Sequence, residues 1–124
     1  MSLELNKDQI ERFSRQIILK NIGIVGQKKI LNSKVLIVGM GGLGCPVAEF
    51  LTRSGIGVLG IVDNDLVSIS NIHRQSLYDQ KDLNKSKVKI AQKKLKDIKK
   101  EKLEYKKKSE ISDEIVDRII DQLN

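Results

Sequence analysis

Residues 35–45 read VLIVGMGGLGC, and this stretch decides the fold. The apolar run at residues 35–38 is typical of a buried parallel strand. The glycines after it fit G-x-G-x-x-G: Gly39 permits a tight turn, Gly41 lets a phosphate approach the backbone, and Gly44 lets helix and strand pack closely. We therefore predict a strand, a glycine turn and a helix start whose free N–H groups favour an anion.

A second apolar run, at residues 58–62, predicts the neighbouring strand, and Asp63 stands at its end, 24 residues after Gly39. A carboxylate at this place can accept hydrogen bonds from ribose hydroxyls. The glycine turn and this acid together indicate a nucleotide, although they do not separate NAD from ATP. The simpler alternative is a glycine turn needed only for packing.

A helix is predicted near the amino terminus. Asn6 can act as its N-cap, with Gln9 at the third helical position. Gly23 and Gly26 are expected to break the pattern. The apolar residues expected on one side of this helix are Ile10, Phe13, Ile17 and Ile18.

Helices and strands also alternate after the glycine turn. Residues 43–54 predict a helix that ends at Gly55, and residues 64–83 predict a long loop that can hold a short helix. An amphipathic, lysine-rich helix follows, then a weak strand at residues 103–105 and a last helix capped by Ser112. The side chains expected to face inward are Leu43, Val47, Phe50 and Leu51 in the first of these helices and Val88, Ala91, Leu95 and Ile98 in the second.

This order of elements predicts an α/β fold, a Rossmann-like doubly wound parallel sheet of about three strands behind an N-terminal helix. A repeating pattern of this kind would continue with another strand, so the sheet is expected to be truncated. No linker or internal repeat divides the chain. We expect residues 1–124 to form a single nucleotide-binding domain.

The net charge of +7 is concentrated in residues 81–108, where 13 Lys stand against four acidic residues. Such a segment can attract nucleic acid or an acidic protein, but we favour a solvated helix face. Cys45 is the single cysteine, which excludes an internal disulfide and a zinc site made of several thiolates. The chain begins without a signal-peptide pattern and has no apolar run of membrane-spanning length, so we expect a cytoplasmic location.

The loop after Asp63 carries groups that a dehydrogenase does not need. Asp65 follows, residues 70–75 read SNIHRQ, and Lys87 comes later. Attack at phosphorus spreads negative charge over the phosphate oxygens, which fixed cations and amide donors stabilise. Arg offers a planar fork and Lys a point charge, so the two types complement each other at a triphosphate.

Several elements of the sequence together resemble the HesA/MoeB/ThiF family of adenylating enzymes, which are related to the ubiquitin-activating enzymes. The resemblance spans roughly residues 8–90 and is nearest to the molybdopterin-synthase and thiamine sulfur-carrier adenylyltransferases. It implies that the chain is the N-terminal portion of a larger adenylating domain. The matching elements are RFSRQ at residues 12–16, VLIVGMGGLGC at residues 35–45, GIGVLGIVDND at residues 55–65, and SNIHRQ at residues 70–75 with Lys87.

The resemblance implies a role for each matching position. Gly42 would lie against the nucleotide, Asp63 would hold the ribose and Asp65 would line the same pocket. Arg15 would reach across a homodimer interface to the partner's ATP. The catalytic groups implied are Arg15, Arg74 and Lys87, and the nucleotide-binding residues are Gly39, Gly41, Gly42, Gly44, Asp63, Asp65, Ser70, Asn71, Ile72, His73, Arg74 and Lys87.

The implied reaction is attack by the C-terminal Gly-Gly carboxylate of a ubiquitin-like sulfur-carrier protein on the α-phosphate of ATP, with release of pyrophosphate. The Asp that helps to hold Mg²⁺ in the family would follow residue 124, and the chain lacks the family's C-x-x-C zinc motifs and catalytic cysteine. We therefore expect little or no adenylation by these 124 residues alone. Cys45 is interpreted as a structural thiol, and His73 as a contact made through its backbone.

Two other functions remain open from the sequence. An NAD-linked oxidoreductase would use the same glycine turn, although the S-N-x-x-R-Q loop does not favour an oxidoreductase. A non-catalytic interaction module would bind an acidic partner through its lysine-rich segment. Within the family, the molybdopterin, thiamine, peptide-antibiotic and tRNA-modification pathways all remain possible.

Overall fold

Two parallel strands form the centre of the computed structural model, which describes residues 4–99. β1 (Lys34–Val38) pairs with β2 (Val58–Val62) in register along its whole length, at the places where the apolar runs predicted strands. Parallel strands end at the same edge of a sheet, so Gly39 and Asp63 become neighbours there.

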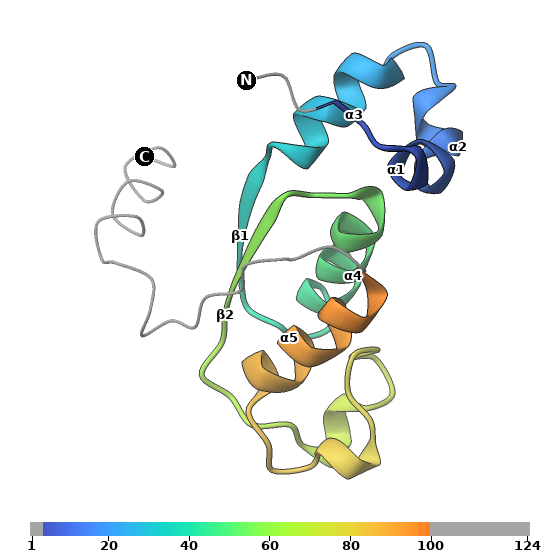
Figure 1. The fold of residues 1–124 in the computed structure, drawn as a ribbon. Helices are drawn as coiled ribbons and strands as arrows, with labels where there is room; N and C mark the ends of the chain where they lie inside the picture. Colours follow the sequence, from blue (N-terminus) through green and yellow to red (C-terminus); the bar gives the residue numbers. More distant parts are fainter. Residues whose placement is uncertain (1–3, 100–124) are drawn as a thin grey trace, which may run out of the picture.

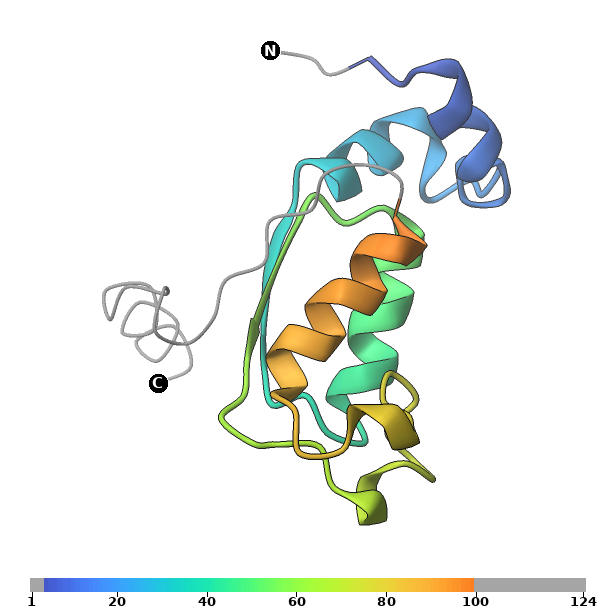
Figure 2. The same ribbon diagram turned by 60° about the horizontal axis from the view of Figure 1, so that its bottom comes forward.

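Two helices cover one face of these strands. α4 (Gly44–Ser54) runs from the end of β1 back to the start of β2, and α5 (Lys87–Ile98) packs beside α4 (Figures 1 and 2). This is the α/β, Rossmann-like arrangement that the sequence predicts. The predicted strand at residues 103–105 and the helix after Ser112 lie outside the described residues.

The core lies between the strands and these two helices. α5 points Val88, Ala91 and Leu95 inward, which confirms the predicted face. Most of the core is aliphatic, so its stability comes from the removal of branched side chains from water. The other buried members are Ile37, Met40, Cys45, Ala48, Ile56, Leu59, Ile61, Val67, Leu77 and Tyr78.

The predicted inner face of α4 is wrong. Leu43, the residue before the helix, is 85% exposed and Phe50 is 67% exposed, whereas the buried residues of α4 are small: Cys45, Ala48 and Thr52. Small side chains let α4 lie close to the strands and to α5. The larger apolar side chains are therefore left outside; Val47 is also exposed, and only Leu51 of the predicted stripe packs against the core.

β1 is less buried than its apolar sequence predicts. Ile37 is buried, but Val38 is largely exposed. Within residues 4–99, helices pack on only one face of the two strands, so the other face has no cover (Figure 2).

Three short helices precede the sheet: α1 (Lys7–Arg12), α2 (Ser14–Ile17) and α3 (Gly23–Leu31). The predicted cap is confirmed, because Asn6 accepts a hydrogen bond from the Gln9 N–H and the Gln9 side chain accepts one from the Asn6 N–H, each 2.9 Å long. Reciprocal capping of this kind fixes where α1 begins.

The amino-terminal helix predicted as one element is interrupted at Phe13, and Gly23 begins α3 instead of breaking a helix. Phe13 is buried against Gly55, where an added Cβ would lie 2.6 Å from the ring. Of the predicted apolar stripe, only Phe13 is fully buried, and its ring packs on a glycine. Ile10 and Ile18 are consequently exposed, and Ile17 is only partly buried.

Buried amides join the amino-terminal helices to the end of α4. The Gln16 side chain donates to the Gln27 Oε1 at 2.7 Å and to the Ser54 carbonyl at 3.1 Å. Gln27 is completely buried and donates to the same carbonyl at 3.0 Å. These bonds satisfy the Ser54 carbonyl, one of the last carbonyls of α4, and they hold α2 in place.

The loop between β2 and α5 contains two short 3₁₀ helices, η1 (Ile69–Asn71) and η2 (Gln80–Asp82). Lys94 of α5 forms ion pairs with η2 and the residue before it: its Nζ lies 2.8 Å from Asp82 Oδ2 and 3.3 Å from Asp79 Oδ2. Within residues 4–99, none of the helices has the length and apolar character that crossing a membrane requires.

Candidate functional site

The glycine turn after β1 is held in a defined shape by the neighbouring strand. Gly39 adopts φ +96°, which a glycine tolerates best, and its N–H donates to the Val62 carbonyl at 2.7 Å. A Cβ on Gly44 would collide with the Gly39 carbonyl oxygen. Gly39 and Gly44 thus serve the geometry of the turn, and the start of α4 is brought close beneath it.

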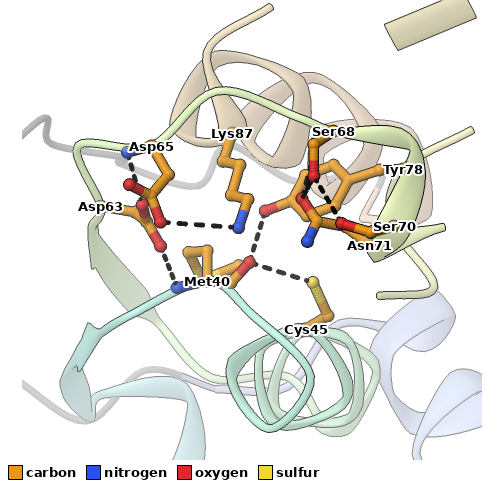
Figure 3. A network of polar contacts seen from close by, with 9 residues as sticks. All are labelled: Met40, Cys45, Asp63, Asp65, Ser68, Ser70, Asn71, Tyr78 and Lys87. Atoms are coloured by element: carbon orange, nitrogen blue, oxygen red, sulfur yellow. Dashed lines mark hydrogen bonds and ion pairs between the residues drawn. The ribbon is translucent and has the colours of Figure 1, made fainter. Parts of the chain in front are cut away.

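Asp63 closes β2 and binds the turn directly. Its Oδ2 accepts from the Met40 N–H and its Oδ1 from the Asp65 N–H, both at 2.7 Å (Figure 3). A carboxylate has about four acceptor positions, so both oxygens can still receive a hydroxyl donor. Asp63 therefore positions the glycine turn and retains the capacity to bind a ribose.

The carbonyl of Met40 is held as firmly as its N–H. The Tyr78 hydroxyl donates to it at 2.7 Å and the Cys45 thiol at 3.4 Å (Figure 3). Burial raises the pKa of the Cys45 thiol, and burial together with the adjacent Cys45 raises that of Tyr78. Cys45 is completely buried, which agrees with a structural thiol.

Lys87 brings an incompletely paired positive charge beside the turn. Its side chain is 6% exposed, and its Nζ lies 3.8 Å from Asp65 Oδ2, longer than a hydrogen bond (Figure 3). No residue of the described range accepts a hydrogen bond from this Nζ. Lys85 and Lys89, which flank Lys87 in the sequence, are exposed. Burial thus separates Lys87 from the two lysines that flank it in the sequence.

Asn71 is oriented by two serines of the same loop. Its Oδ1 accepts from the Ser68 N–H and from the Ser68 hydroxyl, each at 3.0 Å, and the Ser70 hydroxyl lies 3.0 Å from that of Ser68. The amide oxygen is occupied, so the Asn71 Nδ2 is left as the group that can donate to a ligand. Figure 3 shows Asn71 on the same side of the turn as Lys87.

Arg74 and Gln75 lie over consecutive glycines. A Cβ on Gly42 would stand 3.6 Å from Arg74 Cδ, and one on Gly41 would stand 3.7 Å from Gln75 Nε2. Arg74 Nη1 donates to the Ser70 carbonyl at 2.8 Å, which fixes the guanidinium above the turn. His73 is exposed, with Nε2 3.4 Å from Arg74 Nη1, and Ile72 is partly buried.

Arg15 is the predicted site residue that one chain does not bring to the turn. It lies on α2, beyond the amino ends of the strands, whereas the glycine turn follows their carboxyl ends (Figure 1). Its side chain is exposed. A single copy of the chain therefore separates Arg15 from the other predicted residues.

A hollow of about 470 Å³ adjoins the glycine turn. No residue of β2, α5 or the polar loop lines it, so it lies beside the polar groups and not among them. Its lining is the end of β1, the turn and the first residues of α4: Ile37, Val38, Gly39, Gly41, Gly42, Leu43, Gly44 and Val47.

The residues brought together suit an anion bound to a sugar. The start of α4, Lys87, Arg74 and the Asn71 amide offer positive charge and N–H donors, while Asp63 offers acceptors. Within residues 4–99, no group of three or more His, Cys, Asp or Glu is arranged to hold a metal ion.

Comparison with known proteins agrees with this geometry. Residues 13–124 match the ThiF family. The chain belongs to the ThiF family. Its relatives include the "adenylyltransferase and sulfurtransferase MOCS3" of Drosophila willistoni, 54% identical over 77 residues, which are 62% of this chain and 17% of that protein. The protein of the same name from Drosophila virilis is 58% identical over 74 residues, 60% of this chain and 16% of that protein.

Solved structures of similar fold support the same assignment. PaaA superposes with a TM-score of 0.76 at 33% identity, over 90% of this chain and 36% of PaaA. Escherichia coli MccB, crystallised with ATP, gives a TM-score of 0.71 at 30% identity, over 82% of this chain and 31% of MccB. The ThiF-family chain therefore spans about a sixth of the length of these curated relatives and about a third of these structures.

Three contributors to this ThiF-family site were not predicted from the sequence. Met40 stands at a position that the glycine pattern leaves free, and Tyr78 lies in a loop without periodicity. Gln75 belongs to the S-N-x-x-R-Q motif, but nothing in its spacing indicates which glycine it contacts. The apolar residue Leu77 beside Tyr78 is a sequence signal that could have indicated a buried position, since both residues lie in the core.

Proposed function

We propose that this chain supplies the ATP-binding half of a cytoplasmic enzyme that adenylates the C-terminal glycine of a ubiquitin-like sulfur-carrier protein of the molybdopterin or thiamine type. The observation that carries the proposal is the approach of Asp63, Arg74 and Lys87 to one glycine turn. Relatives named adenylyltransferase, and a structural neighbour solved with ATP, support the choice of ATP over NAD.

Each group has a distinct task in this proposal. The N–H groups of the turn at Gly41 and Gly42 and the start of α4 hold phosphate oxygens. Asp63 accepts from the ribose hydroxyls, while Lys87 and Arg74 face the phosphates. The remaining contacts come from Asp65, Ser70, Asn71, Ile72 and His73, which surround the nucleotide.

The proposed reaction forms one bond and breaks another at the α-phosphorus. A carboxylate oxygen of the carrier's last glycine attacks, the bond to the bridging oxygen breaks, and pyrophosphate leaves with the electron pair. Negative charge on the phosphate oxygens grows in the transition state, and the fixed charges of Lys87 and Arg74 stabilise it. Mg²⁺ would neutralise the leaving group; we expect its Asp ligand to come from chain beyond residue 124.

A homodimer would complete the site. Arg15 lies at the far end of the strands from its own glycine turn, so in this proposal it serves the ATP of a second copy. The segment that follows α2, together with α3, exposes apolar side chains that a partner can cover. These are Ile18, Leu19, Ile24 and Val25. Residues 1–124 would then be the first part of a larger adenylating domain.

Ligand-dependent thermal stability tests the proposal. A ligand that binds only the folded state raises its melting temperature, and at 100 times its Kd it adds about 2.7 kcal/mol of stability. We expect ATP with Mg²⁺ to raise the melting temperature of the chain and NAD to leave it unchanged. A rise with NAD alone would replace the adenylating enzyme with an oxidoreductase.

A further inference from the structure

Gln75 closes the S-N-x-x-R-Q motif, and its side chain is almost completely buried against the glycine turn, with 3% exposure. Its backbone is fixed on both sides: its N–H donates to the Asn71 carbonyl at 2.8 Å, and its carbonyl accepts from the Tyr78 N–H at 3.1 Å. The loop that carries Asn71 and Arg74 therefore delivers the Gln75 amide to the turn in a set position.

The amide oxygen of Gln75 is buried without a hydrogen-bond donor. Among the side-chain nitrogen and oxygen atoms of residues 4–99, it is the one that is buried and has no partner. A buried acceptor without a donor destabilises a fold, so native proteins keep such groups chiefly where a water, an ion, a ligand or a function employs them. Packing alone would be served better by an apolar side chain of similar length, such as methionine.

The position of Gln75 relates this unpaired oxygen to the nucleotide site. Gln75 Nε2 stands 3.7 Å from where a Cβ on Gly41 would lie, and within residues 4–99 no other atom outside residues 40–42 comes within 4 Å of that point. The preceding residue, Arg74, covers Gly42 in the same way at 3.6 Å. Consecutive loop residues thus cover consecutive glycines, at the place where a phosphate would approach the backbone.

We propose that Gln75 is a positioning residue of the nucleotide site: its buried amide packs on Gly41 and sets the peptide of that glycine for a phosphate oxygen. The role rests on the proposed function, because it requires a phosphate at the turn. It adds to the site a residue whose amide is unfavourable for the empty protein and useful to the loaded one.

The substitution Gln75→Met in the full chain separates stability from binding. We expect the melting temperature without ligand to equal or exceed that of the unchanged protein, while the Kd for ATP with Mg²⁺ rises about tenfold or more. Adenosine, which has no phosphate, should bind both proteins equally. Gln75→Glu, which places a carboxylate at the turn, should weaken ATP binding further.

Gln80→Met is the matched control, because Gln80 is an exposed glutamine of the same loop. It should change neither melting temperature nor Kd. A second readout needs no nucleotide: amide hydrogen exchange at residues 39–43 should be faster in Gln75→Met than in Gln80→Met.

Different results overturn the role and the function separately. If Gln75→Met binds ATP as tightly as the unchanged protein, or weakens ATP and adenosine equally, the positioning role is wrong and the proposed function stands. If the unchanged protein binds no ATP, the proposed function fails and the role fails with it. Unaltered exchange at residues 39–43 would also contradict the role.

Discussion

At the scale of single residues, Lys87 is the group on which the proposed phosphate site should depend most. Its ammonium group is nearly buried, yet its nearest carboxylate, on Asp65, is 3.8 Å away. A buried cation with so weak a partner is costly in an empty protein. The same charge is stabilised once an anion binds beside it. In the proposed function, Lys87 therefore lowers the stability of the empty protein and strengthens ligand binding.

The substitution Lys87→Met should therefore affect binding more than folding. We expect the free energy of unfolding to stay within about 1 kcal/mol of the original or to rise, because the desolvated charge is removed. The rise in melting temperature caused by ATP with Mg²⁺ should disappear. Thermal unfolding with and without ATP measures both effects.

Lys85→Met and Lys89→Met serve as controls for Lys87→Met, since both lysines are exposed on the same segment. They should keep the ATP effect. Equal loss in all three variants would show that ATP responds to the general positive charge of this segment and not to a defined site.

The sequence predicts some of these residues better than others for a physical reason. Asp63 stands at a strand end, so its spacing from the glycine turn carries the prediction, whereas Lys87 is chosen by the resemblance to the family. Gln75 and Tyr78 act through contacts across the loop, at 3.7 Å from the Cβ position of Gly41 and 2.7 Å from the Met40 carbonyl. Such contacts follow from tertiary folding, which local patterns do not encode.

At the scale of elements, the close approach of Phe13 to Gly55 determines how the amino-terminal helices meet α4. Gly55 adopts φ +95°, and an added Cβ would lie 2.6 Å from the ring. We expect Gly55→Ala to destabilise the protein by about 2–4 kcal/mol, through backbone strain and overpacking together. Urea unfolding measures the difference.

Gly23→Ala is the control for backbone strain alone. Gly23 also has a positive φ, +59°, but among the described residues an added Cβ would meet no atom within 4 Å beyond its chain neighbours and the backbone of its own helix. The loss should be about 1 kcal/mol, the cost of the left-handed conformation. If both variants lose the same stability, the contact with Phe13 contributes nothing.

The pairing of Lys94 with Asp82 gives η2 and α5 a pH-dependent link. Burial opposes ionisation of Asp82, but hydrogen bonds from Lys94 and from the Asp79 N–H outweigh it and lower the pKa of Asp82 below its ordinary 3.8. For Lys94, the bonds to Asp82 and Asp79 likewise outweigh burial and raise the pKa above 10.5.

The sign of both shifts predicts where this link stabilises the fold. The contribution from Asp82 is present above its unfolded pKa and is lost as the pH falls through the lowered folded value. The contribution from Lys94 is present below its unfolded pKa and is lost as the pH rises through the raised folded value. We expect Lys94→Met to destabilise the protein at pH 7 and much less at about pH 2. The exposed Lys93→Met is the control, and an equal effect at both pH values would contradict the link.

α4 shows why element boundaries were predicted better than element faces. Its helix ends at Gly55 as expected, because a glycine stop is a local signal. Its buried side is made of Cys45, Ala48 and Thr52, whereas the stripe chosen by hydrophobicity faces outward except for Leu51. Close packing selected small side chains for the interior, and that choice depends on neighbours that a hydrophobic pattern does not describe.

At the scale of the whole molecule, the proposed site needs two copies of the chain. Arg15→Ala and Lys87→Met should each abolish the ATP effect on their own dimers. In a mixture, the Lys87→Met chain supplies Arg15 to the intact pocket of the Arg15→Ala chain. ATP binding by the mixture, measured by calorimetry after subunit exchange, should therefore recover in part; no recovery would mean that Arg15 does not act across an interface.

The peptide of Met40 has a consequence for any ligand that meets the molecule. Asp63 engages its N–H, and Tyr78 and Cys45 engage its carbonyl, so the segment is immobilised from both directions. A flexible loop loses conformational entropy when it binds a ligand, whereas this segment has already lost that entropy during folding. In the proposed function, the nucleotide therefore binds a segment that already has its binding conformation.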